Sequence, residues 1–121
     1  MEIASQSNFT TFYNHRAEPY FTFLKNGQKT IEGRIKKEKY AEIKAGDHII
    51  VQNNAETDSV EVVVKATRIY STFKEMLEKE EYKKVLPDVQ SIDEGVAVYE
   101  RFYTQEQQCE FGIVAIEVEV I

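Results

Sequence analysis

The chain has 121 residues, 42% of them hydrophobic, which indicates one domain over residues 1–121 with a single core. The formal net charge of −6 argues against indiscriminate binding to nucleic acid, which requires many phosphate contacts. The one cysteine, Cys109, excludes an internal disulfide, and the sequence has no apolar run long enough to span a membrane. We therefore expect a soluble, cytoplasmic protein.

The first half of the chain predicts short elements separated by turns. Residues 1–14 are polar with scattered aromatics and predict an N-terminal arm or a first edge strand. Pro19 and Gly27 bracket a short helix, because proline favours helix starts and glycine follows helix ends. A turn then leads into a strand from residue 30, and a second strand is expected over 47–51.

The second half predicts a long strand, three helices and a final strand. Alternating valines indicate a strand over 60–69, and a similar pattern marks 113–120. Between them, three Ser/Thr-x-x-Glu/Gln sequences are typical of helix starts; they begin at Thr72, Ser91 and Thr104. The first helix is expected to run to about residue 84. Strands at both ends with late helices predict an α+β fold, a small mixed β-barrel with helices packed outside.

The second of these helices carries apolar residues at helical spacing. They are Val96, Tyr99, Phe102 and Tyr103. Such an aromatic stripe is usually part of the core, so we expect it to be buried rather than to stack on nucleic-acid bases.

Residues 27–34 carry the most informative chemistry in the sequence. Gly27 and Lys29 lie in the turn, and alternation in the following strand places Glu32 and Arg34 on one face. This group suits an anionic or amide-bearing ligand. Glu32 is a candidate general base, and Lys29 or Arg34 is a candidate to stabilise the developing oxyanion. The alternative is a surface ion pair, which contributes only about 0–1 kcal/mol to stability.

The pattern Gly-x-Lys-x-x-Glu-x-Arg resembles the signature of ASCH domains, small relatives of the PUA RNA-binding fold. Further segments are similar to the small stand-alone bacterial and archaeal members of that family. These segments are 44–51, 70–77, 84–87, 91–96, 99–103 and 111–116. The resemblance implies a PUA-like barrel and a cleft for RNA or a nucleotide, lined by Gly27, Lys29, Glu32 and Arg34.

Some small members of the family are N4-acetylcytidine amidohydrolases that use a Lys-Thr-Glu triad. The resemblance places the triad lysine at Lys29, but Glu32 occupies the threonine position, and Glu80 or Glu81 is the candidate for the glutamate. The catalytic candidates are therefore Lys29 and Glu32. Three functions remain open. The domain could hydrolyse a modified nucleoside or RNA, it could bind RNA or a nucleotide without catalysis, or it could bind a protein partner through its acidic helices.

Charge and histidine content refine the expected partners. Residues 25–44 hold seven basic and three acidic side chains, which would guide an anionic ligand or simply form a solvated loop. His15 and His48 have no partners at metal-ligand spacing, so neither a metal nor a cofactor is expected. The oligomeric state is left open by the sequence.

Overall fold

The computed structural model describes residues 9–121, which fold around one mixed five-stranded sheet. The strands are β1 (Thr11–Arg16), β2 (Ile31–Ile35), β3 (His48–Asn53), β4 (Ser59–Tyr70) and β5 (Ile113–Val120). The helices are α1 (Tyr20–Lys25), α2 (Phe73–Lys79), α3 (Tyr82–Val85), α4 (Ile92–Glu100) and α5 (Gln105–Phe111), with a 3-10 turn at Glu38–Ala41.

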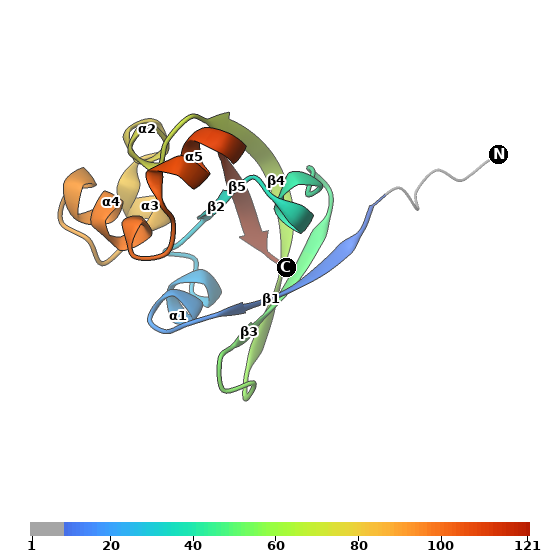
Figure 1. Cartoon of the computed structure of the whole chain (residues 1–121). Helices are drawn as coiled ribbons and strands as arrows, with labels where there is room; N and C mark the ends of the chain where they lie inside the picture. The colour runs from blue at the N-terminus through green and yellow to red at the C-terminus, as the bar shows by residue number, and fades with distance from the viewer. Residues whose placement is uncertain (1–8) are drawn as a thin grey trace.

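The sheet has the strand order β1-β3-β4-β5-β2 and curls into a half-barrel. β1 pairs with β3 in parallel, whereas the other neighbouring strands are antiparallel. Helices α2 to α5 gather on one side of the sheet, and α1 lies near the end of β1 (Figure 1). The predicted α+β, PUA-like fold with helices outside the sheet is confirmed, and the barrel is open between its edge strands, β1 and β2.

Two hydrophobic clusters lie on opposite faces of the sheet. The inner cluster includes Val62, Ile116 and Phe21 of α1, and the outer cluster joins the sheet to helices α2 to α4. In β2, Ile31 and Ile35 belong to the outer cluster. Because side chains alternate along a strand, Glu32 and Arg34 share the opposite, inner face. The sequence predicts the shared face but not which side of the sheet it occupies. The site residues of β2 therefore lie at the opening between the two edge strands.

Two predicted helices differ from the structure. The expected helix over 72–84 is divided into α2 and α3, because Glu81 adopts the left-handed backbone conformation, with φ of 63°. The helix that begins after Ser91 ends at Glu100. Phe102 lies beyond that end, where helical spacing no longer fixes its direction, and it is exposed rather than buried.

The structure describes only part of the predicted N-terminal arm or edge strand over residues 1–14. An edge strand does form at β1, but it begins at Thr11, and residues 1–8 lie outside the described part of the chain. Among the helices of residues 9–121, none has the length and apolar character that crossing a membrane requires.

Candidate ligand-binding site

The centre of the site is the Glu32 carboxylate, which three cationic side chains surround. Lys29 Nζ lies 3.1 Å from Oε1, and Arg34 Nη2 donates to Oε2 at 3.1 Å. Arg16 Nη2 pairs with the same Oε2. Because Arg16 ends β1 and Glu32 belongs to β2, this ion pair joins the two edge strands by side chains. We call these four residues the Glu32 cluster.

Lys29 is the most deeply buried member of the Glu32 cluster, with 3% of its surface exposed. Besides Glu32, its Nζ donates to the carbonyl oxygens of Ile31 at 2.8 Å and Val85 at 2.6 Å. Burial lowers the pKa of Lys29 to about 7, an effect that the negative charge of Asp88 partly opposes. The lysine therefore links β2 to α3 and titrates near neutral pH.

The cluster carries more positive than negative charge. One carboxylate faces three cationic groups, and the side chains of Arg16 and Arg34 are only 17% and 16% exposed. The Nε atoms of both arginines are buried and have no hydrogen-bond partner among residues 9–121. The protein thus leaves both guanidinium groups incompletely paired, a state that an anionic ligand would relieve.

Tyrosine rings border the charged groups. Arg34 Cζ lies 4.9 Å from the ring centroid of Tyr40, whose hydroxyl donates to Asn14 at 3.0 Å. On the other side, Lys29 Nζ lies 5.9 Å from the ring centroid of Tyr20. Burial and the nearby Asp88 raise the pKa of Tyr20 to about 12, so its hydroxyl stays protonated at neutral pH. Both rings offer flat apolar faces beside the cations.

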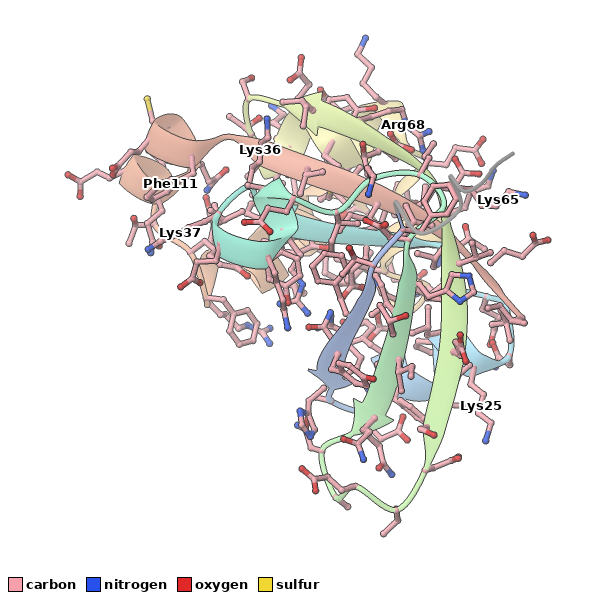
Figure 2. All side chains as sticks on the ribbon, turned by 90° about the vertical axis from the view of Figure 1, so that its right-hand side faces the viewer. Lys25, Lys36, Lys37, Lys65, Arg68 and Phe111 are labelled. Atoms are coloured by element: carbon pink, nitrogen blue, oxygen red, sulfur yellow. The ribbon has the colours of Figure 1, made fainter. Side chains whose placement is uncertain are left out.

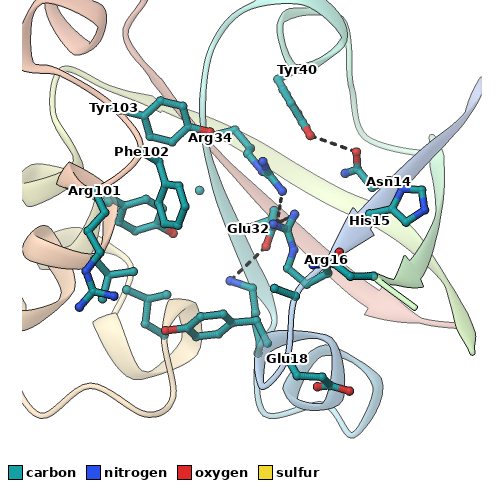
Figure 3. A pocket seen from close by; sticks show the side chains of 18 residues that line it. Asn14, His15, Arg16, Glu18, Glu32, Arg34, Tyr40, Arg101, Phe102 and Tyr103 are labelled. Atoms are coloured by element: carbon teal, nitrogen blue, oxygen red, sulfur yellow. Dashed lines mark hydrogen bonds and ion pairs between the residues drawn. The ribbon is translucent and has the colours of Figure 1, made fainter. Parts of the chain in front are cut away.

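Together these groups line a cavity of about 610 Å³. Figure 3 shows the Glu32 cluster at its centre, between the end of β1 on one side and the segment after α4 on the other. The segment after α4 contributes Arg101, Phe102 and Tyr103 to the lining. A cavity of this volume matches the usual size of small-ligand sites.

The structure brings most of the predicted site residues together. Lys29, Glu32 and Arg34 line the cavity, whereas Gly27 lies in the turn and borders a separate surface depression with Lys29. The φ of Gly27 is 87°, and a Cβ there would meet nothing within 4 Å. Gly27 therefore shapes the backbone that leads to Lys29.

The two candidate triad glutamates lie elsewhere. Glu80 and Glu81 border a smaller cavity of about 160 Å³ whose lining does not include Lys29. The carboxylate of Glu80 accepts hydrogen bonds from Arg68 and Tyr70, so it is held by a structural network. The geometry therefore assembles no Lys-Thr-Glu triad around Lys29.

The basic segment 25–44 does not form one continuous patch. Lys25 lies on the opposite side of the molecule from Lys36 and Lys37, which project beside Phe111 (Figure 2). Lys25 pairs with Asp58, and Lys37 Nζ lies 4.9 Å from the Phe111 ring. Of the seven basic residues in this segment, only Lys29 and Arg34 line the cavity.

The histidines and Cys109 make no second site. His15 contacts Glu56 and His48 contacts Glu61, both at 2.7 Å, and Cys109 is exposed. Within residues 9–121, no three His, Cys, Asp or Glu side chains are grouped so that they could hold a metal ion.

Sequence reasoning missed several lining residues. Arg16 was not among the predicted site residues, but it pairs with Glu32 across the opening between the edge strands. Tyr40 and Arg101 follow no local pattern that would mark them as site residues. Their positions depend on the curl of the sheet, which adjacent sequence does not reveal.

A half-barrel whose edge strands meet at a Lys-Glu-Arg cluster defines a PUA-like domain with a charged cleft. The chain belongs to the ASCH domain family, whose family model matches residues 16–121. A comparison with curated proteins finds no match.

Solved structures agree with this assignment. The chain is similar to the crystal structure of the hypothetical protein PH0355, with 47% identity, a TM-score of 0.83, and coverage of 92% of this chain and 99% of that one. The solution NMR structure of protein PF0455 from Pyrococcus furiosus has 40% identity and a TM-score of 0.74. The match covers 92% of this chain and 97% of that one. Protein EF3133 from Enterococcus faecalis V583 is similar in fold alone. Its crystal structure has 18% identity and a TM-score of 0.57, and the match covers 83% of this chain and 68% of that one.

Proposed function

We propose that the chain binds RNA or a nucleotide in the cavity around Glu32. The observation that carries this proposal is the Glu32 cluster, in which three cationic groups share one carboxylate at the centre of the cavity. The family assignment supports it, because ASCH domains are generally RNA-binding. Phosphate or base oxygens would pair with the guanidinium groups, and the tyrosine rings would contact a base.

The overall charge supports a selective ligand rather than general binding to polyanions. The chain carries −6 in total, and the Glu32 cluster concentrates positive charge in one enclosed place. A negative body repels long polyanions, whereas the cavity attracts one or a few phosphates. We therefore expect a shallow dependence of RNA affinity on salt, corresponding to a few phosphate contacts.

Arg34→Gln should weaken binding of a fluorescein-labelled, mixed-sequence, single-stranded hexaribonucleotide by about 10-fold or more. A hydrogen bond to a charged group contributes about 1.5–3 kcal/mol, and each 1.4 kcal/mol corresponds to about 10-fold in affinity. Fluorescence anisotropy measures the dissociation constants, and thermal unfolding verifies that the variant is folded.

Lys74→Gln is the matched control for charge, because Lys74 is exposed on α2 and lines a different cavity. It should leave the affinity within about 2-fold of the native value, since surface substitutions away from a site have small effects. Equal losses in both variants would mean that the RNA responds to overall charge, and the proposed site would be wrong.

Hydrolysis of N4-acetylcytidine to cytidine and acetate is the second candidate function. The observation that favours it is Lys29, whose pKa of about 7 suits proton transfer and which lies 3.1 Å from Glu32. In this reaction Glu32 would take a proton from the water that attacks the acetyl carbonyl, and Arg34 would stabilise the oxyanion. Lys29 would give a proton to the N4 nitrogen as its bond to the acetyl carbon breaks.

Chromatography of N4-acetylcytidine incubated with the native chain tests this activity. Cytidine that forms with the native chain and not with a Glu32→Asp variant that thermal unfolding shows to be folded would support hydrolysis, because aspartate keeps the charge but shortens the reach of the base. Absence of cytidine with the native chain would remove this candidate and leave ligand binding as the function of the cavity.

A further inference from the structure

We propose that Arg101 and Phe102 form a second nucleotide position at the mouth of the cavity, so that the preferred ligand is single-stranded RNA of at least two nucleotides. This inference rests on the proposed RNA-binding function of the Glu32 cavity. One nucleotide would occupy the cavity, and the base of its neighbour would stack on Phe102 while Arg101 contacts a phosphate.

Phe102 is the first observation, because 70% of this aromatic side chain is exposed. The two nearby tyrosines, Tyr99 and Tyr103, instead pack in the core. Tyr99 stacks on Phe73 with 4.1 Å between ring centroids, and Tyr103 stacks on the same ring at 5.4 Å. Phe102 therefore remains in solvent although two tyrosines beside it are packed, and it also lines the cavity.

The second observation is continuity with the positive charge of the cavity. Arg101 is exposed, directly precedes Phe102 and lines the same cavity as Arg16 and Arg34. In Figure 3, Phe102 and Arg101 border one side of the opening, with the Glu32 cluster between them and the end of β1. An aromatic face next to a cation, open to solvent and joined to a cationic cavity, is the arrangement that binds single-stranded nucleic acid.

The base must be unpaired to reach this position. In a duplex, bases stack on one another and present only their edges, so a side chain at a cavity mouth has no access to a base face. A free mononucleotide would occupy the cavity beside the Glu32 cluster and would gain less from Phe102 at the mouth than a longer strand does. The structure therefore favours a short single strand over both of these ligands.

Tyr13 provides a matched control for aromatic exposure. It is 67% exposed on β1, nearly as much as Phe102, but it does not line the cavity. If exposure alone made an aromatic residue bind RNA, Tyr13 and Phe102 would contribute equally to the affinity for the tetranucleotide.

Calorimetric titration of the native chain, Phe102→Ala and Tyr13→Ala with cytidine 5′-monophosphate and with a single-stranded tetraribonucleotide tests the proposal. Phe102→Ala should weaken tetranucleotide binding by about 5- to 150-fold, the range for loss of one stacked base. The loss of mononucleotide affinity should be several-fold smaller, and Tyr13→Ala should change neither affinity. The same four nucleotides within the stem of an RNA hairpin should bind more weakly than the single strand.

Arg101→Gln tests the phosphate contact independently. It should lower the slope of the logarithm of tetranucleotide affinity against the logarithm of salt concentration by about 0.7, the value for one contact on a single strand. Lys74→Gln should leave that slope unchanged.

The outcomes separate this inference from the proposed function. If Arg34→Gln weakens both ligands but Phe102→Ala weakens neither, the cavity binds a nucleotide and the second position is wrong. If Phe102→Ala weakens both ligands equally, Phe102 belongs to the first position, and the two-position proposal also fails. If the native chain binds neither ligand, both proposals are overturned.

Discussion

Replacing Glu32 with glutamine should destabilise the folded chain by about 3–5 kcal/mol, the usual cost of removing one partner from a buried ion pair. The substitution preserves shape but leaves Lys29, Arg16 and Arg34 without their shared carboxylate. The side chain of Glu32 is only 11% exposed, so water cannot replace that charge effectively. Urea denaturation followed by circular dichroism measures the loss.

Glu81→Gln is the matched control for this substitution. Glu81 pairs with Lys84 at 3.5 Å, but its side chain is 73% exposed. An exposed pair contributes about 0–1 kcal/mol, so the control should retain nearly all of the native stability. A Glu32→Gln variant as stable as the control would show that the cluster does not hold the edge strands together.

Lys29→Met should destabilise the chain by about 2–4 kcal/mol at neutral pH. Methionine has a similar length and no donor, so the buried carbonyl oxygens of Ile31 and Val85 lose their hydrogen bonds. Each unsatisfied buried group costs about 1–3 kcal/mol. Lys25→Met is the control, because Lys25 pairs with Asp58 at the surface, with 48% of its side chain exposed.

The pH dependence of this variant reports the titration of Lys29. Its pKa is about 7 in the folded chain and 10.5 ordinarily, so between these values the unfolded chain binds more protons. The contribution of Lys29 to the free energy of unfolding therefore rises with pH over this window. Denaturation at pH 6.5 and 9.5 should show a larger difference between native chain and Lys29→Met at pH 9.5. A difference that shrinks with pH would contradict the lowered pKa.

Both expectations bear on how the site is tested. Lys29 and Glu32 line the cavity and are expected to stabilise the fold, so a loss of binding in their variants would be difficult to separate from a loss of structure. Arg34, Arg101 and Phe102 are the better probes of binding, because they lie closer to solvent. A ligand that binds the folded chain would also raise its stability.

The local part of the site could be predicted from the sequence because it depends on one strand. Alternation along β2 is enough to place Glu32 and Arg34 on one face and Ile31 and Ile35 on the other. The strands over 60–69 and 113–120 could also be predicted, since every second residue is apolar over 60–66 and over 114–120, and the structure places β4 and β5 there.

The rest of the site depends on contacts between distant segments. Arg16 reaches Glu32 because the curl of the sheet brings its edge strands, β1 and β2, close together. No local sequence pattern predicts this curl. The burial predicted for Phe102 was wrong because α4 ends two residues earlier. The break at Glu81 was missed because glutamate rarely adopts a positive φ.

The central claim is that the Glu32 cavity is the RNA-binding site, and NMR titration of the ¹⁵N-labelled chain with a single-stranded tetraribonucleotide tests it most directly. The predicted result is that the largest amide shifts fall on Arg16, Gly33, Arg34 and residues 101–103, which line the cavity. Shifts concentrated on Lys36 and Lys37 or on Lys65 and Arg68, outside the cavity, would contradict the claim, as would spectra that RNA does not change.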